Sequence, residues 1–151
     1  MTQELRYWDD LIPGEEGETP AITPTREDII AFAKDYDPQP FHLEEAAARE
    51  SIFGGLAASG WHTASLTFAL IREHCLPEVA WRSNLGFDNL RWKRPVRPDV
   101  PLRVRYAWRE LLPEGVSPGA GQARLDVQVL EGDETLAMEM SLLMEIDRRP
   151  T

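Results

Sequence analysis

The sequence predicts an α+β fold in which an antiparallel sheet wraps around one long, buried helix. Helical patterns occupy the first half of the chain, alternating strand patterns fill the second half, and residues 56–75 form the most apolar long stretch. Runs of helices followed by runs of strands are typical of α+β domains or of two separate domains. Because 151 residues are too few for two good cores, we expect a single domain over residues 1–151.

Composition and charge narrow the possible partners. The chain has a formal net charge of −10 and a pI of about 4.7. The electric field of this negative charge repels nucleic acid and anionic membrane. A small anionic ligand is still compatible, because a few local cations can hold it. Cys75 is the single cysteine, so no disulfide forms within the chain, as suits a reducing cytoplasm. The sequence shows neither a signal peptide nor 18 consecutive apolar residues, so we expect a cytoplasmic protein.

The first expected helix spans residues 25–35. An acidic, turn-rich entry segment precedes it and includes a short edge strand near residues 18–22. Thr25 stands three residues before Asp28, a spacing that resembles a capping box. Apolar residues then recur at helical spacing, which predicts one buried face.

A stiff loop and a buried helix follow. Pro38 and Pro40 restrict the preceding residues to extended conformations and break the helix over residues 36–41. We expect a short helix over residues 43–49 and a turn at residues 51–55. Residues 58–74 are small or apolar around most of the helix circumference, which predicts a buried helix.

The second half of the chain predicts consecutive antiparallel strands. Apolar and polar residues alternate in it, as in half-buried strands, and turn-rich segments separate the alternating runs. The expected strands cover residues 85–92, 102–108, 123–130 and 135–146.

Asp37 and His42 share the proline-stiffened loop and form a candidate acid–base pair. A carboxylate and an imidazole held together can move protons in both directions near neutral pH. Five residues of extended polyproline chain would span about 15 Å, at roughly 3.1 Å per residue. The loop must therefore bend near residues 39–41. By themselves, Asp37 could be a turn residue and His42 a capping or solvent-facing residue.

Gly60 lies beside the predicted start of the buried helix. The first N–H groups of a helix lack internal acceptors, and the helix dipole is positive there. A glycine at this position leaves room for a ligand carbonyl oxygen and so predicts an oxyanion-type site. The alternative is a glycine required only for packing.

Other candidate residues favour structural interpretations. His62 on the buried helix is expected to be a satisfied core or interface histidine, and His74 and Cys75 lack a third metal ligand at suitable spacing. A basic cluster between strands is expected to be a solvated face or a phosphate contact: Arg91, Lys93, Arg94 and Arg97. Four tryptophans are expected in the core or an interface: Trp61, Trp81, Trp92 and Trp108.

Two segments carry a family resemblance over most of residues 17–147. They are DPQPFHLEEAAARESIFGGLAASGWHTA at residues 37–64 and GFDNLRWKRPVRPDVPLRV at residues 86–104. The chain resembles the MaoC-like dehydratases, relatives of the (R)-specific enoyl-CoA hydratases. Asp37, Pro40, His42 and Gly60 stand at the positions of the family motif.

The resemblance implies a hot-dog fold and a carbon–oxygen lyase of fatty acid metabolism, an enoyl-CoA hydratase/dehydratase. It would hydrate 2-enoyl thioesters, as acyl-CoA or acyl-carrier thioesters, or dehydrate the 3-hydroxyacyl products, without metal or redox cofactor. Asp37 would be the main general base or acid, His42 would orient the same water and share its proton, and the Gly60 N–H would polarise the thioester carbonyl. The family also implies a homodimer or dimer of dimers, with a substrate site that includes Gln39, Pro40, Phe41, Ser59 and Trp61.

Two departures from the family pattern leave alternatives open. Gln39 replaces the family's Asn, and Ser59 replaces the His before the glycine. Ser59 could donate a hydrogen bond to the loop or cap the helix. An acyl-thioester binding protein without turnover is therefore one alternative. A thioesterase is less favoured, because such hot-dog enzymes usually carry a carboxylate on the central helix and residues 57–72 contain neither Asp nor Glu.

Overall fold

The computed structural model describes residues 4–151 and contains four α-helices, two short 3-10 helices and five strands. The α-helices are α1 (Arg26–Tyr36), α2 (Pro40–Leu43), α3 (Glu45–Arg49) and α4 (Gly60–His74). The strands are β1 (Glu16–Glu18), β2 (Trp81–Trp92), β3 (Leu102–Leu112), β4 (Ala120–Glu131) and β5 (Leu136–Asp147). The 3-10 helices are η1 (Trp8–Asp10) and η2 (Leu76–Glu78).

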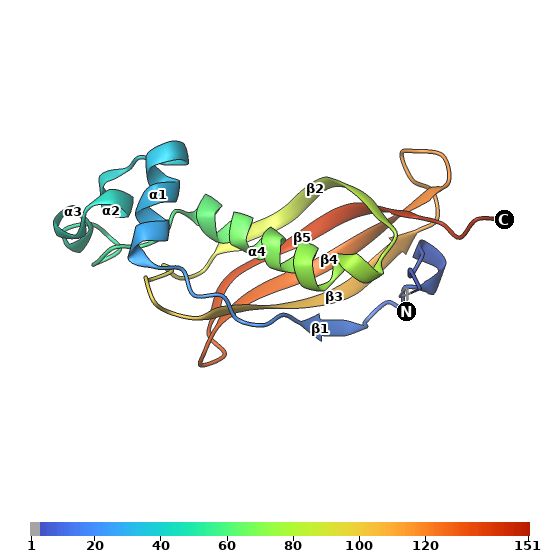
Figure 1. The fold of residues 1–151 in the computed structure, drawn as a ribbon, viewed down its shortest axis with the longest axis horizontal. Helices are drawn as coiled ribbons and strands as arrows, with labels where there is room; N and C mark the ends of the chain where they lie inside the picture. The colour runs from blue at the N-terminus through green and yellow to red at the C-terminus, as the bar shows by residue number, and fades with distance from the viewer. Residues whose placement is uncertain (1–3) are drawn as a thin grey trace.

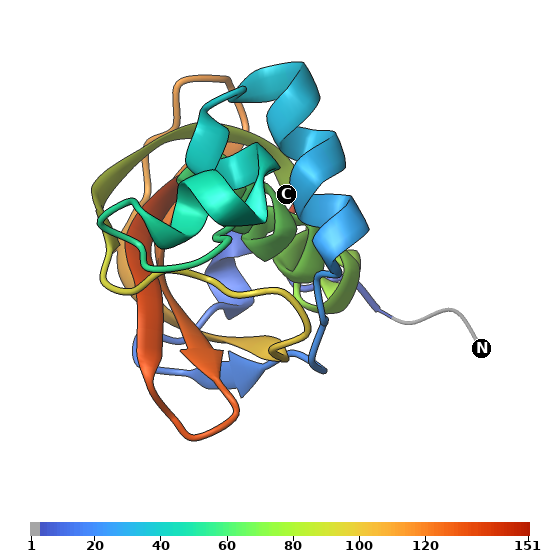
Figure 2. The ribbon, with the colours of Figure 1, turned by 90° about the vertical axis from the view of Figure 1, so that its left-hand side faces the viewer.

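The sheet has the order β1-β3-β4-β5-β2, and every neighbouring pair is antiparallel. The long helix α4 crosses one face of this curved sheet, while α1, α2 and α3 gather beyond its N-terminal end (Figure 1). Figure 2 looks onto this helical end, with the sheet curving behind it. The predicted α+β arrangement, an antiparallel sheet around one long helix, is confirmed. No helix in residues 4–151 is long and apolar enough to cross a membrane.

Helix α1 begins as its capping box predicts. The Thr25 hydroxyl accepts from the Asp28 N–H at 3.1 Å, and the Asp28 carboxylate accepts from the Thr25 N–H at 3.0 Å. Ile29 and Ala33 are fully buried on its inner face. The observed bounds differ from the predicted helix over residues 25–35 by one residue at each end.

The segment after α1 differs from the prediction, which placed a loop over residues 36–41 and one helix over residues 43–49. Pro40 instead starts the helical turn α2, since proline suits the first helical position. Glu44 is extended, with φ −132° and ψ 128°, and separates α2 from α3. The chain therefore bends at residues 39–41, as the expected acid–base pair requires, and His42 lies on a helical turn.

Helix α4 is buried on one side only, so the prediction of burial around most of its circumference is wrong for the single chain. Its inner face consists of His62, Thr63, Thr67, Leu70 and Ile71. Trp61, on the opposite side of the helix, is 52% exposed. Strand β2 beside it also leaves apolar side chains exposed: Leu85, Phe87 and Trp92.

The strands are longer than the alternating patterns indicate, because pairing with neighbours continues into residues without clear alternation. Val104, Leu125, Met138 and Met144 are among the core side chains that are fully buried between the sheet and α4. The short edge strand lies at Glu16–Glu18 rather than near residues 18–22, where only Ile22 forms an isolated bridge with Leu102. Pro20 interrupts the pairing because it has no N–H to donate.

Candidate active site

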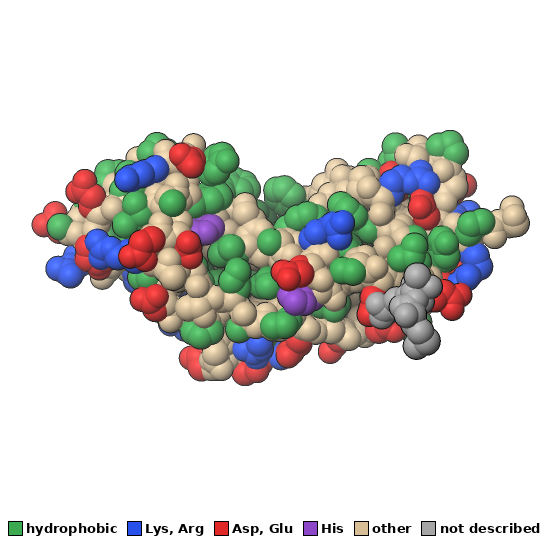
Figure 3. Space-filling view, viewed as in Figure 1, with side chains coloured by type: hydrophobic (Ala, Val, Ile, Leu, Met, Phe, Trp, Pro, Cys, Tyr) green, Lys and Arg blue, Asp and Glu red, His purple; other side chains and the backbone are tan. Residues whose placement is uncertain are grey.

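A cavity of about 600 Å³ opens at the N-terminal end of α4. In Figure 3 the upper outline of the molecule is hollowed between the helical end and the sheet, with hydrophobic side chains around the hollow. The cavity walls come from four segments, namely residues 37–42, residues 52–53, the first turn of α4, and residues 92–96. Asp37, His42 and Gly60 all line this cavity.

Asp37 follows α1 directly, and its backbone N–H donates to Ala33 O at 2.9 Å. Its carboxylate accepts two short hydrogen bonds, one on each oxygen. Gln39 Nε2 donates to Oδ1 at 2.7 Å, and Ser59 Oγ donates to Oδ2 at 2.7 Å. Burial opposes ionisation of Asp37, but these hydrogen bonds and the nearby His42 outweigh it and lower the Asp37 pKa below its ordinary value.

His42 is buried, and the backbone fixes its tautomer. Its Nδ1 lies 2.7 Å from the carbonyl oxygen of Ala57. A carbonyl can only accept, so Nδ1 carries a hydrogen and donates it. In the neutral ring, Nε2 is therefore an acceptor, and it lies 3.5 Å from Asp37 Oδ2. The structure thus brings the two predicted acid–base groups together at the cavity.

Gly60 is the first residue of α4, and Ser59 is its N-cap. The Ser59 hydroxyl accepts from the Trp61 N–H at 3.2 Å, and the Ser59 carbonyl accepts from the N–H groups of His62 and Thr63. Within residues 4–151 no acceptor meets the Gly60 N–H, which remains available to a ligand.

Trp92 explains why position 60 must be glycine. A Cβ at Gly60 would lie 2.5 Å from Trp92 Cε2, far inside van der Waals contact. The Trp92 indole also donates its N–H to Gly60 O at 2.8 Å. Gly60 is therefore required for packing, and its N–H group is also available to a ligand.

The residues expected at the substrate site divide into two groups. Gln39, Phe41 and Trp61 line the cavity, whereas Pro40 and Ser59 do not. Ser59 is fully buried, and its hydroxyl both donates to the loop at Asp37 and caps α4, the two contacts considered from the sequence. Because Ser59 is fully buried in this structure, its expected contact with a substrate stays a prediction.

Sequence reasoning missed Ile52, Phe53, Pro95 and Val96 as cavity-lining residues. Local sequence patterns do not reveal these residues, because a long-range contact through Arg97 brings their two segments together. The Arg97 guanidinium donates to Gly55 O at 2.7 Å and also to the carbonyl of Phe53. Arg97 therefore holds the turn at residues 51–55, and the expectation of a solvated face is wrong for it.

Two members of the expected basic cluster do line the cavity. Lys93 and Arg94 are exposed and lie on the wall formed by residues 92–96. The Lys93 ammonium is 3.5 Å from Glu139, a partly exposed pair that contributes little to stability. These two cations remain candidates for the phosphate contact that the sequence suggested.

The expected structural role of His62 is borne out by its burial, but the residue is not satisfied. Its ring stacks on Phe32 with centroids 4.6 Å apart, and its buried Nδ1 has no hydrogen-bond partner among residues 4–151. Burial lowers the pKa of His62, although Asp28 acts in the opposite direction.

Cys75 and Trp108 also behave as structural residues. Burial raises the pKa of the Cys75 thiol to about 12, which disfavours a nucleophilic thiolate. No group of three His, Cys, Asp or Glu side chains in the described part of the chain is arranged to hold a metal. Trp108 is buried in the core, whereas Trp61 and Trp92 meet edge-to-face beside the cavity.

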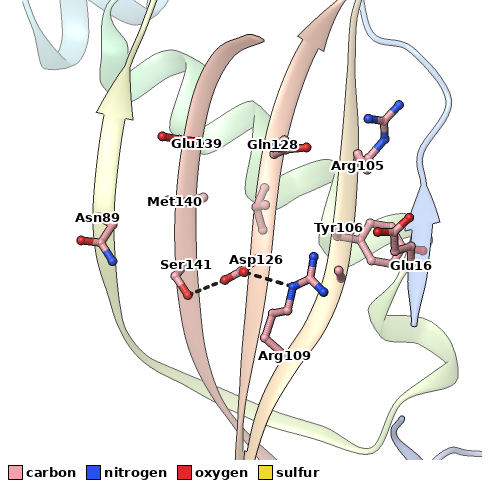
Figure 4. Close-up of a pocket in the computed structure, with 12 residues that line it drawn as sticks. Glu16, Asn89, Arg105, Tyr106, Arg109, Asp126, Gln128, Glu139, Met140 and Ser141 are labelled. Carbon is pink, nitrogen blue, oxygen red and sulfur yellow. Dashed lines mark hydrogen bonds and ion pairs between the residues drawn. The ribbon is translucent and has the colours of Figure 1, made fainter. Parts of the chain in front are cut away.

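A second hollow, of about 320 Å³, lies on the outer face of the sheet (Figure 4). Three of its polar side chains pair with one another. Ser141 Oγ donates to Asp126 Oδ1 at 2.9 Å, and Arg109 Nε lies 3.3 Å from Asp126 Oδ2. The described residues that line this hollow include no histidine. The cavity at α4 is therefore the better candidate for acid–base chemistry.

Comparison with known proteins agrees with the sequence resemblance. A family model described as MaoC like domain matches residues 10–112. Protein MaoC of Klebsiella aerogenes is 34% identical over 101 residues, which cover 66% of this chain but only 30% of that protein.

Several solved structures are similar to this chain over nearly its whole length. A MaoC-like dehydratase from Rhodospirillum rubrum is 32% identical with a TM-score of 0.86, covering 97% of this chain and 99% of that chain. R-hydratase PhaJ1 from Pseudomonas aeruginosa is 24% identical with a TM-score of 0.76, covering 95% and 86%. A Mycobacterium tuberculosis protein with a double hotdog fold is 18% identical with a TM-score of 0.78, covering 97% and 45%. The expected hot-dog fold is confirmed.

Proposed function

This chain belongs to the MaoC-like domain family, and we propose that it hydrates a 2-enoyl thioester or dehydrates the corresponding 3-hydroxyacyl thioester. One observation carries the proposal. Asp37 Oδ2 and His42 Nε2 lie 3.5 Å apart in a cavity that also presents the free N–H of Gly60. The name of the Rhodospirillum rubrum relative, a MaoC-like dehydratase, supports the same reaction class.

The geometry suits addition of water to a polarised double bond. Carboxylate and neutral imidazole both present acceptors, so one water molecule can donate a hydrogen bond to each of them. The Gly60 N–H, at the positive end of the α4 dipole, suits the thioester oxygen as it becomes enolate-like. These groups supply proton transfer and charge stabilisation, so the proposed reaction uses neither a metal nor a redox cofactor.

The proposed substrate is an acyl-CoA. A thioester of an acyl-carrier protein is the alternative substrate. Phe41, Phe53 and Val96 give the cavity an apolar wall for the acyl group. Lys93 and Arg94 also line the cavity, and we expect them to contact a phosphate of the thioester carrier.

A homodimer is part of the proposal, and a dimer of dimers would extend it. The exposed side of α4 and the edge strand β2 enclose an apolar groove of about 350 Å³. Its walls include Trp61, Phe68, Phe87 and Leu90, and a second copy of the chain would cover them. Size-exclusion chromatography with light scattering tests this, since Phe87→Glu should yield monomers.

Hydration of crotonyl-CoA tests the reaction directly, through the loss of enoyl-thioester absorbance. Asp37→Asn preserves the side-chain shape but removes the charge, and it should lower kcat/KM about 100-fold or more. Ser141→Ala is a matched control, because it removes a serine donor to a different aspartate on the outer face of the sheet. Full activity in a folded Asp37→Asn variant would sink the role assigned to this residue.

Binding of an acyl thioester without turnover is the second candidate. The observation that favours it is that both oxygens of Asp37 already accept hydrogen bonds from protein donors. A thermal-shift titration with crotonyl-CoA would then show stabilisation, while the absorbance of the enoyl thioester stays constant.

A further inference from the structure

Residues 52–58, which we call the wall segment, lead from a turn toward the start of α4 and form part of the cavity wall. Phe53 and Ala58 both line the cavity. The Phe53 ring packs against the rings of Phe41 and His42, with centroids 4.9 Å and 5.9 Å away. The position of the wall segment therefore affects the shape of the cavity.

Ser51 holds the first part of the turn that begins the wall segment. Its hydroxyl accepts from the Phe53 N–H at 3.1 Å, and its carbonyl accepts from the Gly54 N–H at 3.1 Å. Gly54 has a φ of +65°, a conformation that glycine adopts without strain. The Ile52 side chain is 97% exposed and adds little packing. The contacts to the second part of the wall segment come from elsewhere in the chain.

Arg97, in the loop after β2, makes these contacts. Its Nη1 donates to Gly55 O at 2.7 Å and to Leu56 O at 3.3 Å. Its Nη2 donates to Phe53 O. One guanidinium thus joins the loop after β2 to three backbone carbonyls of the wall segment.

The region around Arg97 is adapted to this contact. A Cβ at Gly55 would lie 3.2 Å from Arg97 Nη1, so glycine there lets the guanidinium approach the backbone closely. Charged donors make stronger hydrogen bonds than neutral ones, and the planar guanidinium presents donors on two terminal nitrogens. Beside it, the Ala58 N–H donates to Val96 O at 2.9 Å. Arg97 is not among the described residues that line the cavity, so it would act on a ligand through the wall segment.

We propose that Arg97 is a positioning residue that holds the wall segment in one place and thereby determines which acyl chains the cavity accepts. Apolar side chains on both sides of the Arg97 contact line the cavity: Ile52, Phe53 and Val96. A fixed apolar wall discriminates by size, because a chain that overfills the space must displace it. The selectivity rests on the proposed hydration reaction, whereas the ordering of the wall segment does not.

Hydrogen exchange of the full chain without substrate tests the ordering of the wall segment. In Arg97→Ala, the amide hydrogens of Phe53, Gly54 and Ala58 should exchange about tenfold faster or more, because the segment opens more often without its charge-assisted hydrogen bonds. Exchange in β3 and β4 should stay unchanged. Unchanged exchange in the wall segment would overturn the proposal.

Guanidinium chloride supplies the missing group to Arg97→Ala. At about 50 mM, far below denaturing concentrations, it should restore slow exchange in the wall segment. Tetramethylammonium chloride at the same concentration should not, because it matches the ionic strength but has no N–H group to donate. Equal effects of the two salts would contradict a hydrogen-bonding role for Arg97.

The kcat/KM values for crotonyl-CoA and for the longer trans-2-octenoyl-CoA measure selectivity. In Arg97→Ala their ratio should shift about tenfold toward the longer chain, because a loosened wall yields to it, and guanidinium should reverse the shift. Arg103→Ala is the matched control, since Arg103 Nη1 also donates to a backbone carbonyl, Glu131 O at 3.0 Å, and does not line the cavity. It should leave the ratio unchanged. An equal fall in kcat/KM for both substrates in Arg97→Ala would contradict the role in selectivity.

Arg97→Lys provides a second test should Arg97→Ala fail to fold. Lysine keeps the charge but lacks the planar fork that reaches separate carbonyls. Exchange and selectivity should therefore change in the same direction as in Arg97→Ala and by less, and values equal to those of the unmodified protein would overturn the proposal. If neither enoyl-CoA is hydrated while the exchange results hold, the proposed function fails but the ordering of the wall segment by Arg97 stands.

Discussion

Residues 25–60, at the helical end of the molecule, and strands β3, β4 and β5 differ in how their buried side chains are paired. In the strands, side chains such as Val104, Leu125 and Met144 are fully buried against other apolar groups. At the helical end, His42 and Ser59 are buried with specific hydrogen-bond partners. Many apolar contacts together stabilise the sheet, whereas each hydrogen bond at the site joins one particular donor to one particular acceptor. A substitution at the site should therefore affect chemistry more than folding.

The sharpest way to test this contrast is His42→Asn. Loss of the imidazole removes a general acid–base group, and we expect kcat/KM for crotonyl-CoA hydration to fall about 100- to 10,000-fold. The midpoint of thermal unfolding, measured by circular dichroism, should change by only a few degrees. Unfolding of the variant at ordinary temperature would instead place His42 among the residues that hold the fold together.

Leu125→Ala should show the opposite behaviour. Leu125 is fully buried on β4, and its truncation leaves a cavity that should lower the free energy of unfolding by about 2–5 kcal/mol. Urea unfolding measures this loss. The kcat/KM of the folded fraction should stay close to that of the unmodified protein, and a large fall would show that the sheet core and the site are coupled.

His62, in the first turn of α4, makes the stability of the protein depend on pH. Burial lowers the pKa of His62, so the folded state keeps the ring neutral. Above about pH 6.5 the ring is neutral in both states and adds no pH dependence. Below this pH the unfolded chain binds a proton that the folded state resists, so stability falls by at most about 1.4 kcal/mol per pH unit until the folded pKa is reached.

His62→Phe keeps an aromatic ring against Phe32 and removes the titration. Urea unfolding from pH 7 to pH 5 should therefore show a smaller loss of stability in this variant than in the unmodified protein. Parallel curves for the two proteins would mean that other groups cause the pH dependence.

Thr25→Ala should have the smallest effect. It removes the N-cap hydroxyl of α1 and should lower the free energy of unfolding by about 1 kcal/mol. Thr25→Ser retains the hydroxyl and serves as the control. Because α1 precedes Asp37, a simultaneous fall in activity would show that the start of this helix also positions the site.

Local patterns determined much of the fold. The capping box at Thr25 and Asp28 placed α1 to within one residue, and alternation located β3 to β5 although not their full lengths. Small and apolar residues located α4. For Asp37 and His42, the sequence showed only that the loop must bend if the two side chains are to meet. These signals work because helix caps, periodicity and proline act over a few residues of chain.

Tertiary structure alone decided the contacts that make the site specific. The hydrogen bond from Ser59 to Asp37 joins residues 22 apart, and the Trp92 ring that requires Gly60 comes from 32 residues away. Ala57, 15 residues from His42, selects its tautomer. No periodicity or capping preference encodes such pairs, because they form only when packing brings distant segments together. The sequence by itself therefore identified the candidate groups, and the folded chain decided which of them meet and, through Ala57, which His42 nitrogen carries the hydrogen.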